Sequence, residues 1–336
     1  MTNHSADQMD PLPAGFVRNV RGAFRAAGEQ WLAELPAVLA AYARRWELTL
    51  GRPYQLTYHY VAAATRADGT PAVLKLGVPG GVEFGWQVRA LRLVGGDGMA
   101  RLLAADVPGG AMLLERVEPG QRLTPADESA DPAATEVLLD LMRRLHRPVP
   151  PPDTQLPTTT PAPEPAPGPA PGPAGISLPT VAGWGRGFGR LRARHRGGTG
   201  PLPAVLVDRA ERLYAELAGS PAGPPVLLHG DLHHENALRS GRAGWLAIDP
   251  KGLLGEPAFE VGPVLLNPWD ELRTWPDPAG VLTRRVHQLA DGLAVPRDRV
   301  RAWGFAFAVL SAIWTDEDGG EPDRHSLAVA ELLSGR

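Results

Sequence analysis

A proline-rich segment in the middle of the chain limits how the two flanking parts can be joined. Of the 36 prolines, 12 fall within residues 148–173, and this stretch includes the run PAPEPAPGPAPGPAG. Proline alternating with small residues favours the polyproline conformation and offers no apolar side chains for a core. We therefore expect an exposed, semi-stiff insertion over residues 148–175, which divides the chain without requiring two separate folds. A docking segment for a proline-binding partner is the alternative interpretation.

Hydrophobic periodicity before this insertion predicts helices followed by a small β-rich part. Residues 1–15 are expected to form a disordered lead, and apolar residues recur at helical spacing over residues 16–46. Because proline interrupts a helix, Pro36 predicts two helices in that range. Residues 54–64 and 72–76 are rich in Tyr, Thr and Val and are separated by an Asp-Gly pair, which predicts a β-hairpin.

The remaining elements do not alternate regularly between strand and helix. We expect helices over residues 83–94, 131–146 and 205–218, and strands over residues 112–117, 226–228 and 245–248. Most of the chain beyond these strands, to residue 333, is predicted to be helical. This order predicts an α+β fold. It argues against a Rossmann domain, and neither a dinucleotide-binding glycine motif nor a P-loop motif is present.

Overall composition excludes several classes of protein. Hydrophobic residues make up 43% of the chain, which is enough for a packed core. The absence of cysteine excludes disulfides and thiolate metal sites and is compatible with a reducing cytoplasm. A net charge of −3 does not favour non-specific nucleic-acid binding. With no signal peptide or membrane-length apolar run visible, we expect a cytoplasmic protein without nucleic-acid or membrane partners. No protein partner is evident.

Lysine is almost absent from the chain. Of 34 basic residues, only Lys75 and Lys251 are lysine. A compact ammonium and a planar guanidinium are not interchangeable, so the two positions that keep lysine indicate places where arginine does not serve. Lys75 lies in a predicted strand. Lys251 follows a proline in a predicted turn, where it either contacts phosphate or bonds backbone carbonyls.

Polar residues follow the predicted strand at 226–228 in the segment 229–236, which reads His-Gly-Asp-Leu-His-His-Glu-Asn. Asp231 and Asn236 lie five residues apart, and Asp249 follows the next predicted strand. Three oxygen-bearing side chains of this kind can converge on one hard cation, and Mg²⁺ prefers carboxylate and amide oxygens together with phosphates. An aspartate left outside the metal shell can accept a hydroxyl proton.

The three histidines of the segment leave two further interpretations open. His229, His233 and His234 could supply ligands to a zinc ion, although the HEXXH spacing is absent. They could also be structural, orienting the loop through backbone hydrogen bonds, which is the role we expect for His229. We expect His233 and His234 to be exposed near the site.

These motifs resemble those of a known family of small-molecule kinases. The HGDLHHEN segment and the following Ile-Asp-Pro look like the catalytic and metal-binding loops of aminoglycoside phosphotransferases, and they match the kinase pattern H-x-D-x-x-x-x-N. The strings IDPKGLLGEPAFEV and LSAIWTDEDG are similar to the streptomycin 6-phosphotransferase and hydroxyurea phosphotransferase branch. The resemblance implies a bilobal protein-kinase-like fold. Residues 1–50 would form a lead and helices, 51–117 a small β-rich N-lobe, and 118–336 a mostly helical C-lobe.

The resemblance also implies a role for each matched position, with ATP and Mg²⁺ as cofactors. Asp231 would take or orient the acceptor hydroxyl proton, and Asn236 and Asp249 would hold Mg²⁺. Lys75 would pair with the α- and β-phosphates. The backbone of Glu115 and Val117 would contact adenine.

Two features of the N-terminal half depart from the family pattern. Glutamine stands at position 87, where the family has the glutamate that pairs with the strand lysine, and Glu83 lies one helical turn earlier on the same face. Either the ion pair is relocated to Glu83 or Gln87 holds Lys75 by a neutral hydrogen bond. The phosphate loop is also not glycine-rich, since only Gly69 occurs between residues 54 and 75.

The implied acceptors are small cationic molecules rich in hydroxyl groups, which carboxylates bind by charge-assisted hydrogen bonds. The candidate acceptor-site residues are His234, Glu256, Glu260, Asp270, Glu271, Asp316, Glu317 and Asp318. A solvated loop is the alternative for the last three.

The resemblance therefore implies an ATP- and Mg²⁺-dependent O-phosphotransferase that acts on an aminoglycoside-type antibiotic and gives resistance to it, with streptomycin as the leading acceptor. Three alternatives stay open. The acceptor could be another hydroxylated or guanidino compound, such as a peptide antibiotic or hydroxyurea. The chain could be a non-catalytic nucleotide-binding relative, or a metalloenzyme that does not use ATP.

Overall fold

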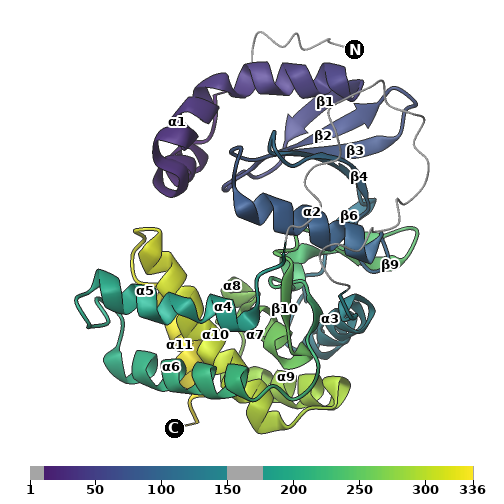
Figure 1. The fold of residues 1–336 in the computed structure, drawn as a ribbon. Helices are drawn as coiled ribbons and strands as arrows, with labels where there is room; N and C mark the ends of the chain where they lie inside the picture. Colours follow the sequence, from purple (N-terminus) through teal and green to yellow (C-terminus); the bar gives the residue numbers. More distant parts are fainter. Residues whose placement is uncertain (1–10, 150–176, 336) are drawn as a thin grey trace. The chain divides into compact units, whose positions relative to one another are not determined.

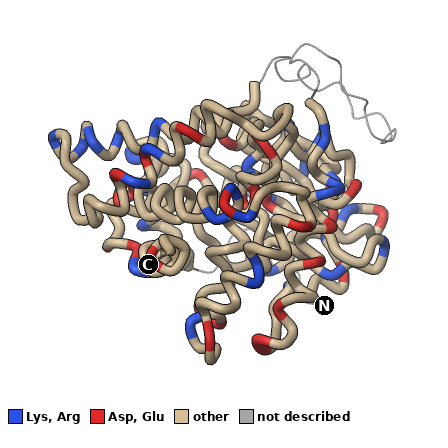
Figure 2. The backbone as a smooth tube through the Cα atoms, turned by 90° about the horizontal axis from the view of Figure 1, so that it is seen from below, with Lys and Arg blue, Asp and Glu red and all other residues tan. Residues whose placement is uncertain are grey.

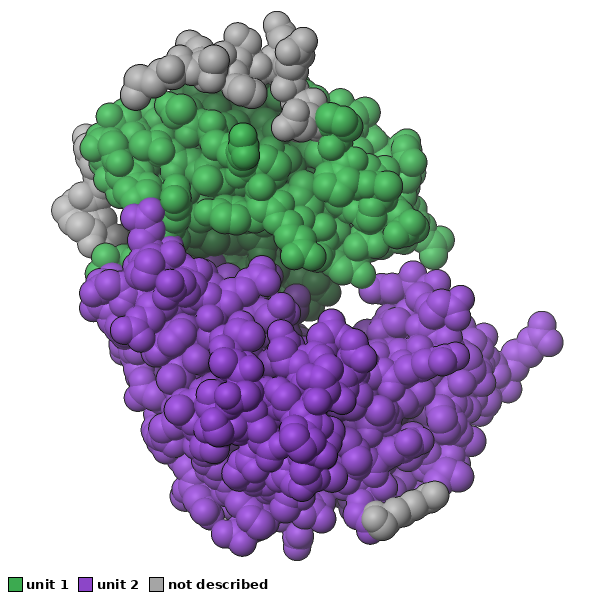
Figure 3. Space-filling view, turned by 180° about the vertical axis from the view of Figure 1, so that it is seen from behind, with its two compact units in different colours: residues 1–88, 100–116, 157–174 green, residues 89–99, 117–156, 175–336 purple. Residues whose placement is uncertain are grey.

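The computed structural model describes residues 11–149 and 177–335 and divides them into a β-rich unit and a mostly helical unit. Unit 1 contains residues 11–88 and 100–116, and unit 2 contains residues 89–99, 117–149 and 177–335 (Figure 3). This is the bilobal α+β arrangement that the sequence predicts. One division falls between Arg116 and Val117, within the segment whose backbone the resemblance assigns to contact with adenine. Most of the predicted proline-rich insertion lies outside the described residues.

Unit 1 is built on an antiparallel sheet with the strand order β1-β2-β3-β5-β4 (Figure 1). The strands are β1 (Leu48–Pro53), β2 (Tyr60–Arg66), β3 (Pro71–Leu76), β4 (Leu102–Asp106) and β5 (Ala111–Glu115). β2 and β3 form the predicted hairpin, with Val61 opposite Lys75. The edge strands β1 and β4 were not predicted, because Gly51 and Pro53 disfavour a strand and LLAAD lacks an alternating pattern.

The range of α1 (Ala14–Arg45) contains two helical segments that meet at a kink, as predicted, but the second segment runs through Pro36, so the position predicted for the break is wrong. Non-helical backbone occurs instead at Arg25, where φ is 50°. Trp31 and Leu35 are buried in one hydrophobic cluster with sheet residues such as Leu74. Packing of this apolar face against the sheet outweighs the local cost of a proline inside a helix, about 3 kcal/mol.

Unit 2 is organised around α10 (Arg297–Glu317), which packs against α5, α6, α7, α9 and α11 (Figure 1). Residues 303–310 of α10 are all buried. The other helices are α2 (Val82–Val94, divided between the units), α3 (Asp131–Leu145), α4 (Val181–Trp184), α5 (Arg186–Arg194), α6 (Ala204–Gly219), α7 (Val261–Leu266), α8 (Trp269–Leu272), α9 (Pro278–Leu293) and α11 (Arg324–Leu333). The predicted helices at 83–94, 131–146 and 205–218 are confirmed, and so is the helical character of the last 80 residues or so.

Two small antiparallel sheets position the polar segment 229–236. One pairs β10 (Leu253–Gly255) with β7 (Val226–Leu228), and the other has the order β6-β8-β9, formed by Pro119–Arg122, Ala237–Ser240 and Gly244–Ala247. The segment therefore begins at the end of β7 and ends at β8, with a single 3-10 turn at His234–Asn236. A second 3-10 turn, at Pro257–Glu260, leads into α7. The predicted strands at 226–228 and 245–248 correspond to β7 and β9.

Charged residues of both signs are distributed over the part of the chain that the structure describes. Blue and red positions are interspersed along the tube in Figure 2. Among residues 11–149 and 177–335, no helix is both long and apolar enough to cross a membrane.

A buried ion pair joins α3 to α9. The Asp131 carboxylate accepts hydrogen bonds from Arg285 Nε at 2.9 Å and from Arg285 Nη2 at 2.5 Å, and both side chains are almost fully buried. Arg285 Nη1 also donates to the carbonyls of Val264 and Asn267, at 2.8 and 2.7 Å. One guanidinium therefore connects three parts of unit 2.

Replacing Arg285 with methionine should lower the free energy of unfolding by about 3–5 kcal/mol, because it leaves the buried Asp131 carboxylate with only the more distant Arg284 guanidinium, at 3.7 Å. Urea denaturation followed by tryptophan fluorescence measures this change. Arg297→Met is the matched control, since Arg297 is half-exposed and pairs only at 3.6 Å with Asp291. Equal effects of the two substitutions would contradict the role given to the buried pair.

Candidate active site

The His229 imidazole joins the segment 229–236 to the chain just before Asp249. His229 is buried, its Nε2 lies 2.9 Å from the Ile248 carbonyl oxygen, and its Nδ1 accepts from the Asp231 N–H at 3.2 Å. A neutral ring protonated on Nε2 satisfies both contacts. Burial accordingly lowers the pKa of His229 despite the nearby carboxylates of Glu260 and Asp231. The structural role predicted for His229 is confirmed.

Backbone hydrogen bonds complete the connection between the two loops. The Lys251 N–H donates to the His229 carbonyl at 2.8 Å, and the Ile248 N–H donates to the Asn236 carbonyl at 2.9 Å. Main-chain hydrogen bonds thus hold the loop carrying Asp231 and the turn carrying Asp249 together, in addition to the contacts of the buried His229 ring.

Gly230 is required by the close packing around the loop. Its φ is +82°, a left-handed conformation that favours glycine. A Cβ atom at this position would lie 3.1 Å from Lys251 Cβ and 3.3 Å from Trp184 Cη2. The partly exposed Trp184 therefore lies directly beside the residue that precedes Asp231.

Asp231 and Asn236 share one loop. The Asn236 amide group donates to the Asp231 carbonyl at 2.9 Å, which leaves the Asn236 side-chain oxygen as a ligand atom. Asp231 keeps about a third of its side chain exposed, as accepting a proton from a substrate requires. Asp249 has a left-handed φ of 59°. Asn236 and Asp249 offer hard oxygen ligands that suit Mg²⁺, which completes its shell with waters and phosphate oxygens.

The zinc interpretation has no support in the described parts of the chain. No group of three His, Cys, Asp or Glu residues there is arranged to hold a metal ion. His234 is fully buried, and burial holds its pKa well below the usual value. The prediction that His234 is exposed and contacts substrate is therefore wrong. His233 is only partly exposed, with Nε2 at 3.8 Å from Asp231 Oδ1.

In unit 1, Gln87 rather than Glu83 contacts the strand lysine. Lys75 Nζ donates to Gln87 Oε1 at 2.7 Å, and both residues are buried. Glu83 is exposed in the first turn of α2. Of the two possibilities that the sequence left open, the neutral hydrogen bond is the one observed. Glu115 ends β5, its carboxylate accepting from the Arg101 N–H at 3.0 Å, and Val117 is buried at the start of the next segment.

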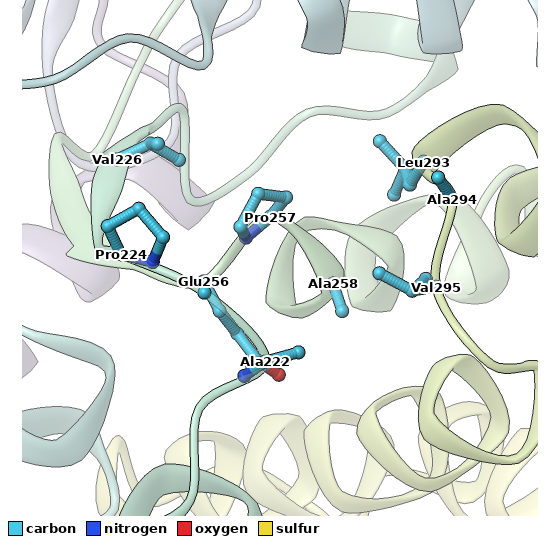
Figure 4. A pocket seen from close by; sticks show the side chains of 10 residues that line it. Ala222, Pro224, Val226, Glu256, Pro257, Ala258, Leu293, Ala294 and Val295 are labelled. Carbon is cyan, nitrogen blue, oxygen red and sulfur yellow. The ribbon is translucent and has the colours of Figure 1, made fainter.

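Two of the predicted acceptor-site carboxylates are buried inside unit 2, which makes their proposed contact with substrate wrong. Glu256 accepts from Arg299 Nη2 at 2.7 Å and from the Trp303 indole N–H. It borders a mostly apolar pocket lined by Ala222, Pro224, Val226, Pro257, Ala258, Leu293, Ala294 and Val295 (Figure 4). This pocket includes no residue of the 229–236 loop.

Glu260 is the second buried carboxylate, and it positions the loop instead. Its two oxygens accept from the His229 N–H at 2.6 Å and from the Gly230 N–H at 2.9 Å. Burial alone raises the pKa of Glu260, but the neighbouring His146 and His229 rings and the Gly230 N–H outweigh it and hold the pKa below its usual value. Sequence reasoning placed Glu260 near the site and missed this role.

The other predicted acceptor-site carboxylates lie on α8 and at the end of α10. Asp270 is exposed and pairs with Arg273 at 3.2 Å, while Glu271 is partly exposed. Glu317 pairs with Arg190 of α5 at 2.7 Å. Asp316 pairs with His195 at 3.0 Å and with Arg194, and Asp318 caps the helix. A cationic ligand would have to displace the α5 arginines from the α10 carboxylates, so this binding role stays a prediction.

The fold of the chain is the protein-kinase-like fold. Solved structures with this fold include choline kinase LicA from Streptococcus pneumoniae, with a TM-score of 0.57, 12% identity, and coverage of 90% of this chain and 100% of that one. Another is a mutant of aminoglycoside phosphotransferase APH(4)-Ia bound to ADP and hygromycin B, with a TM-score of 0.56, 14% identity, and coverage of 88% and 99%.

The chain belongs to the aminoglycoside/hydroxyurea antibiotic resistance kinase family, whose profile matches residues 46–319. It is 32% identical to streptomycin 6-kinase of Streptomyces glaucescens, covering 97% of this chain and 96% of that protein. It is 37% identical to hydroxyurea phosphotransferase of Kitasatospora aureofaciens, covering 93% and 82%. The resemblance stated from the sequence is thus confirmed.

Replacing Glu260 with glutamine should weaken two charge-assisted hydrogen bonds and lower the free energy of unfolding by about 2–3 kcal/mol. The depressed pKa of Glu260 gives this effect a pH dependence. Its contribution is fully present above the ordinary carboxyl pKa of 4.5 and is lost as the pH falls through the lower folded-state value.

Urea denaturation at a series of pH values between neutral and acid tests this expectation, with Glu136→Gln as an exposed control. The difference in free energy of unfolding between wild type and Glu260→Gln should become smaller in acid. If this difference does not change with pH, the ionised Glu260 carboxylate does not stabilise the loop as described.

Proposed function

We propose that this chain transfers the γ-phosphoryl group of ATP to a hydroxyl of an aminoglycoside-type antibiotic, with streptomycin as the first acceptor to test and resistance as the consequence. Support comes from nearly full-length similarity to streptomycin 6-kinases at 32–33% identity. The observation that carries the proposal is the loop in which Asp231 is partly exposed while Asn236 and the connected Asp249 turn present oxygen ligands.

Each of the matched residues would supply a different part of the chemistry. Asp231 would accept the proton of the acceptor hydroxyl as its oxygen attacks phosphorus. Lys75, held by Gln87, would neutralise charge on the α- and β-phosphates. Asn236 and Asp249 would hold Mg²⁺, which when bound stabilises negative charge on the phosphate oxygens. The backbone of Glu115 and Val117 would contact adenine.

The partner we propose is a small, cationic, hydroxylated molecule, bound near Asp270, Glu271 and the carboxylates at the end of α10. We place the reaction in the cytoplasm, where ATP is available. The absence of cysteine is compatible with the reducing conditions there. The proline-rich insertion is not needed in this account and stays a weaker candidate for docking a protein.

Hydroxyurea is the second acceptor to test, because the 37% identity to a hydroxyurea phosphotransferase exceeds the identity to the streptomycin 6-kinases. The two candidates differ in charge, since streptomycin is cationic and hydroxyurea is neutral. Asp270→Asn together with Glu271→Gln should therefore impair only the cationic acceptor.

We expect purified protein with ATP and Mg²⁺ to release ADP in a streptomycin-dependent manner and to give a phosphorylated antibiotic in the mass spectrum. Parallel reactions with hydroxyurea and with no acceptor complete the measurement. Stimulation by hydroxyurea alone would reject streptomycin as the acceptor. Stimulation by neither would reject both acceptors.

Asp231→Asn should lower kcat by about 10²–10⁴-fold, because the amide cannot accept the hydroxyl proton. The dissociation constant for ATP, measured by isothermal titration calorimetry, should stay within a few-fold of wild type. Glu235→Gln changes a carboxylate in the same loop that is half-exposed and pairs loosely with Arg122, so it should keep full activity. A parallel loss of ATP affinity in Asp231→Asn would show that Asp231 does not act as the base.

A further inference from the structure

Lys251, one of the two lysines in the chain, points its ammonium group at Asp231. The distance from Lys251 Nζ to Asp231 Oδ2 is 3.8 Å, and the two side chains are 40% and 32% exposed. An ion pair this exposed adds little to stability. Lysine nevertheless stands here in a chain whose other basic residues, except Lys75, are arginine.

Backbone hydrogen bonds hold the main chain of Lys251 beside the 229–236 segment. The Lys251 N–H donates to the His229 carbonyl oxygen at 2.8 Å, and the Gly252 N–H donates to the same oxygen at 3.2 Å. The close approach of Lys251 Cβ to Gly230 leaves no room for a side chain at position 230. The Lys251 side chain therefore extends from a backbone turn that is held beside Asp231. Its ammonium group can reach a ligand that contacts the Asp231 carboxylate.

We propose that Lys251 is a catalytic residue whose ammonium contacts an oxygen of the phosphoryl group being transferred, an inference that rests on the proposed phosphotransferase function. In that step the acceptor oxygen forms a bond to the γ-phosphorus while the bond from γ-phosphorus to the β–γ bridging oxygen breaks. ADP leaves with the bonding electron pair, and the acceptor proton passes to Asp231. Lys251 stabilises the negative charge that the phosphoryl oxygens carry during the transfer.

The ammonium also counters the repulsion between Asp231 and the incoming phosphate. A carboxylate that must lie near the transferred group repels it, and a cation within 4 Å of that carboxylate reduces this repulsion. A compact ammonium can contact one carboxylate oxygen and one phosphoryl oxygen together. The larger planar guanidinium favours bidentate binding to a single partner. This difference accounts for the retention of lysine at position 251.

The absence of cysteine from the chain makes a direct chemical test possible. Lys251→Cys introduces a single thiol into the full chain, and alkylation with 2-bromoethylamine converts it into a side chain of about the length of lysine that ends in an ammonium. Alkylation with iodoacetamide gives a neutral side chain instead. The wild-type protein has no thiol and is the control for both reagents.

We expect Lys251→Cys to lower kcat by about 10²–10³-fold, as loss of one preorganised charge-stabilising group does in other enzymes. Aminoethylation should restore at least a tenth of wild-type kcat, whereas carboxamidomethylation and Lys251→Arg should not. The dissociation constant for ATP should change by less than a few-fold in every form. Arg239→Met, which removes an exposed positive charge on β8, should have wild-type kcat.

Two outcomes would overturn the assignment. One is a Lys251→Cys protein with kcat within three-fold of wild type, and the other is a loss that aminoethylation does not reverse in a folded protein. The wild-type reaction with streptomycin is measured first, so failure of the proposed function is seen separately. If no acceptor stimulates the wild type, the same comparison is made on Mg²⁺-dependent ATP hydrolysis, where water replaces the acceptor.

Discussion

The contacts of the His229 imidazole bring together the two loops on which the proposed chemistry depends. One ring nitrogen faces the Ile248 carbonyl and the other accepts from the Asp231 N–H, so a single neutral side chain fixes both loops. Glu260 holds the same loop from the buried side through two further N–H groups. Because these partners are buried, the positions of Asp231 and Lys251 are set by the core of unit 2 rather than by mobile surface side chains.

The segment from His229 to Lys251 could be interpreted from the sequence because its chemistry is local. Asp231 and Asn236 share one short loop, and the strand predicted at 245–248 has a clear run of apolar residues, whereas β8, with the sequence ALRS, was not predicted. The hairpin of β2 and β3 was also predictable, since its turn residues directly follow the first strand. Pro36 shows the limit of this reasoning. The local rule predicts a break, but the helix continues because Trp31 and Leu35 pack against strands that are distant in the sequence.

The acidic residues of the site could not be sorted from the sequence for the same reason. In the sequence, Glu256 and Glu260 follow the turn that carries Asp249, and both look available for a cation. Their actual partners lie 43 and 31 residues away, at Arg299 and His229, and only the fold brings them together. Asp316 and Glu317 are likewise paired with Arg194 and Arg190 of α5, more than 120 residues earlier. A carboxylate's net charge is visible in a sequence, whereas its neutralisation by a distant arginine is not.

The hydrogen bond between Lys75 and Gln87 has a consequence for how the nucleotide site responds to acid. A glutamate partner would take up a proton in moderately acidic solution and would then lose its charge and change its contact with the ammonium. The amide of Gln87 has no such ionisation. The Gln87 side of this contact therefore carries no charge at any pH, so acid does not change the partner that Lys75 meets in unit 1.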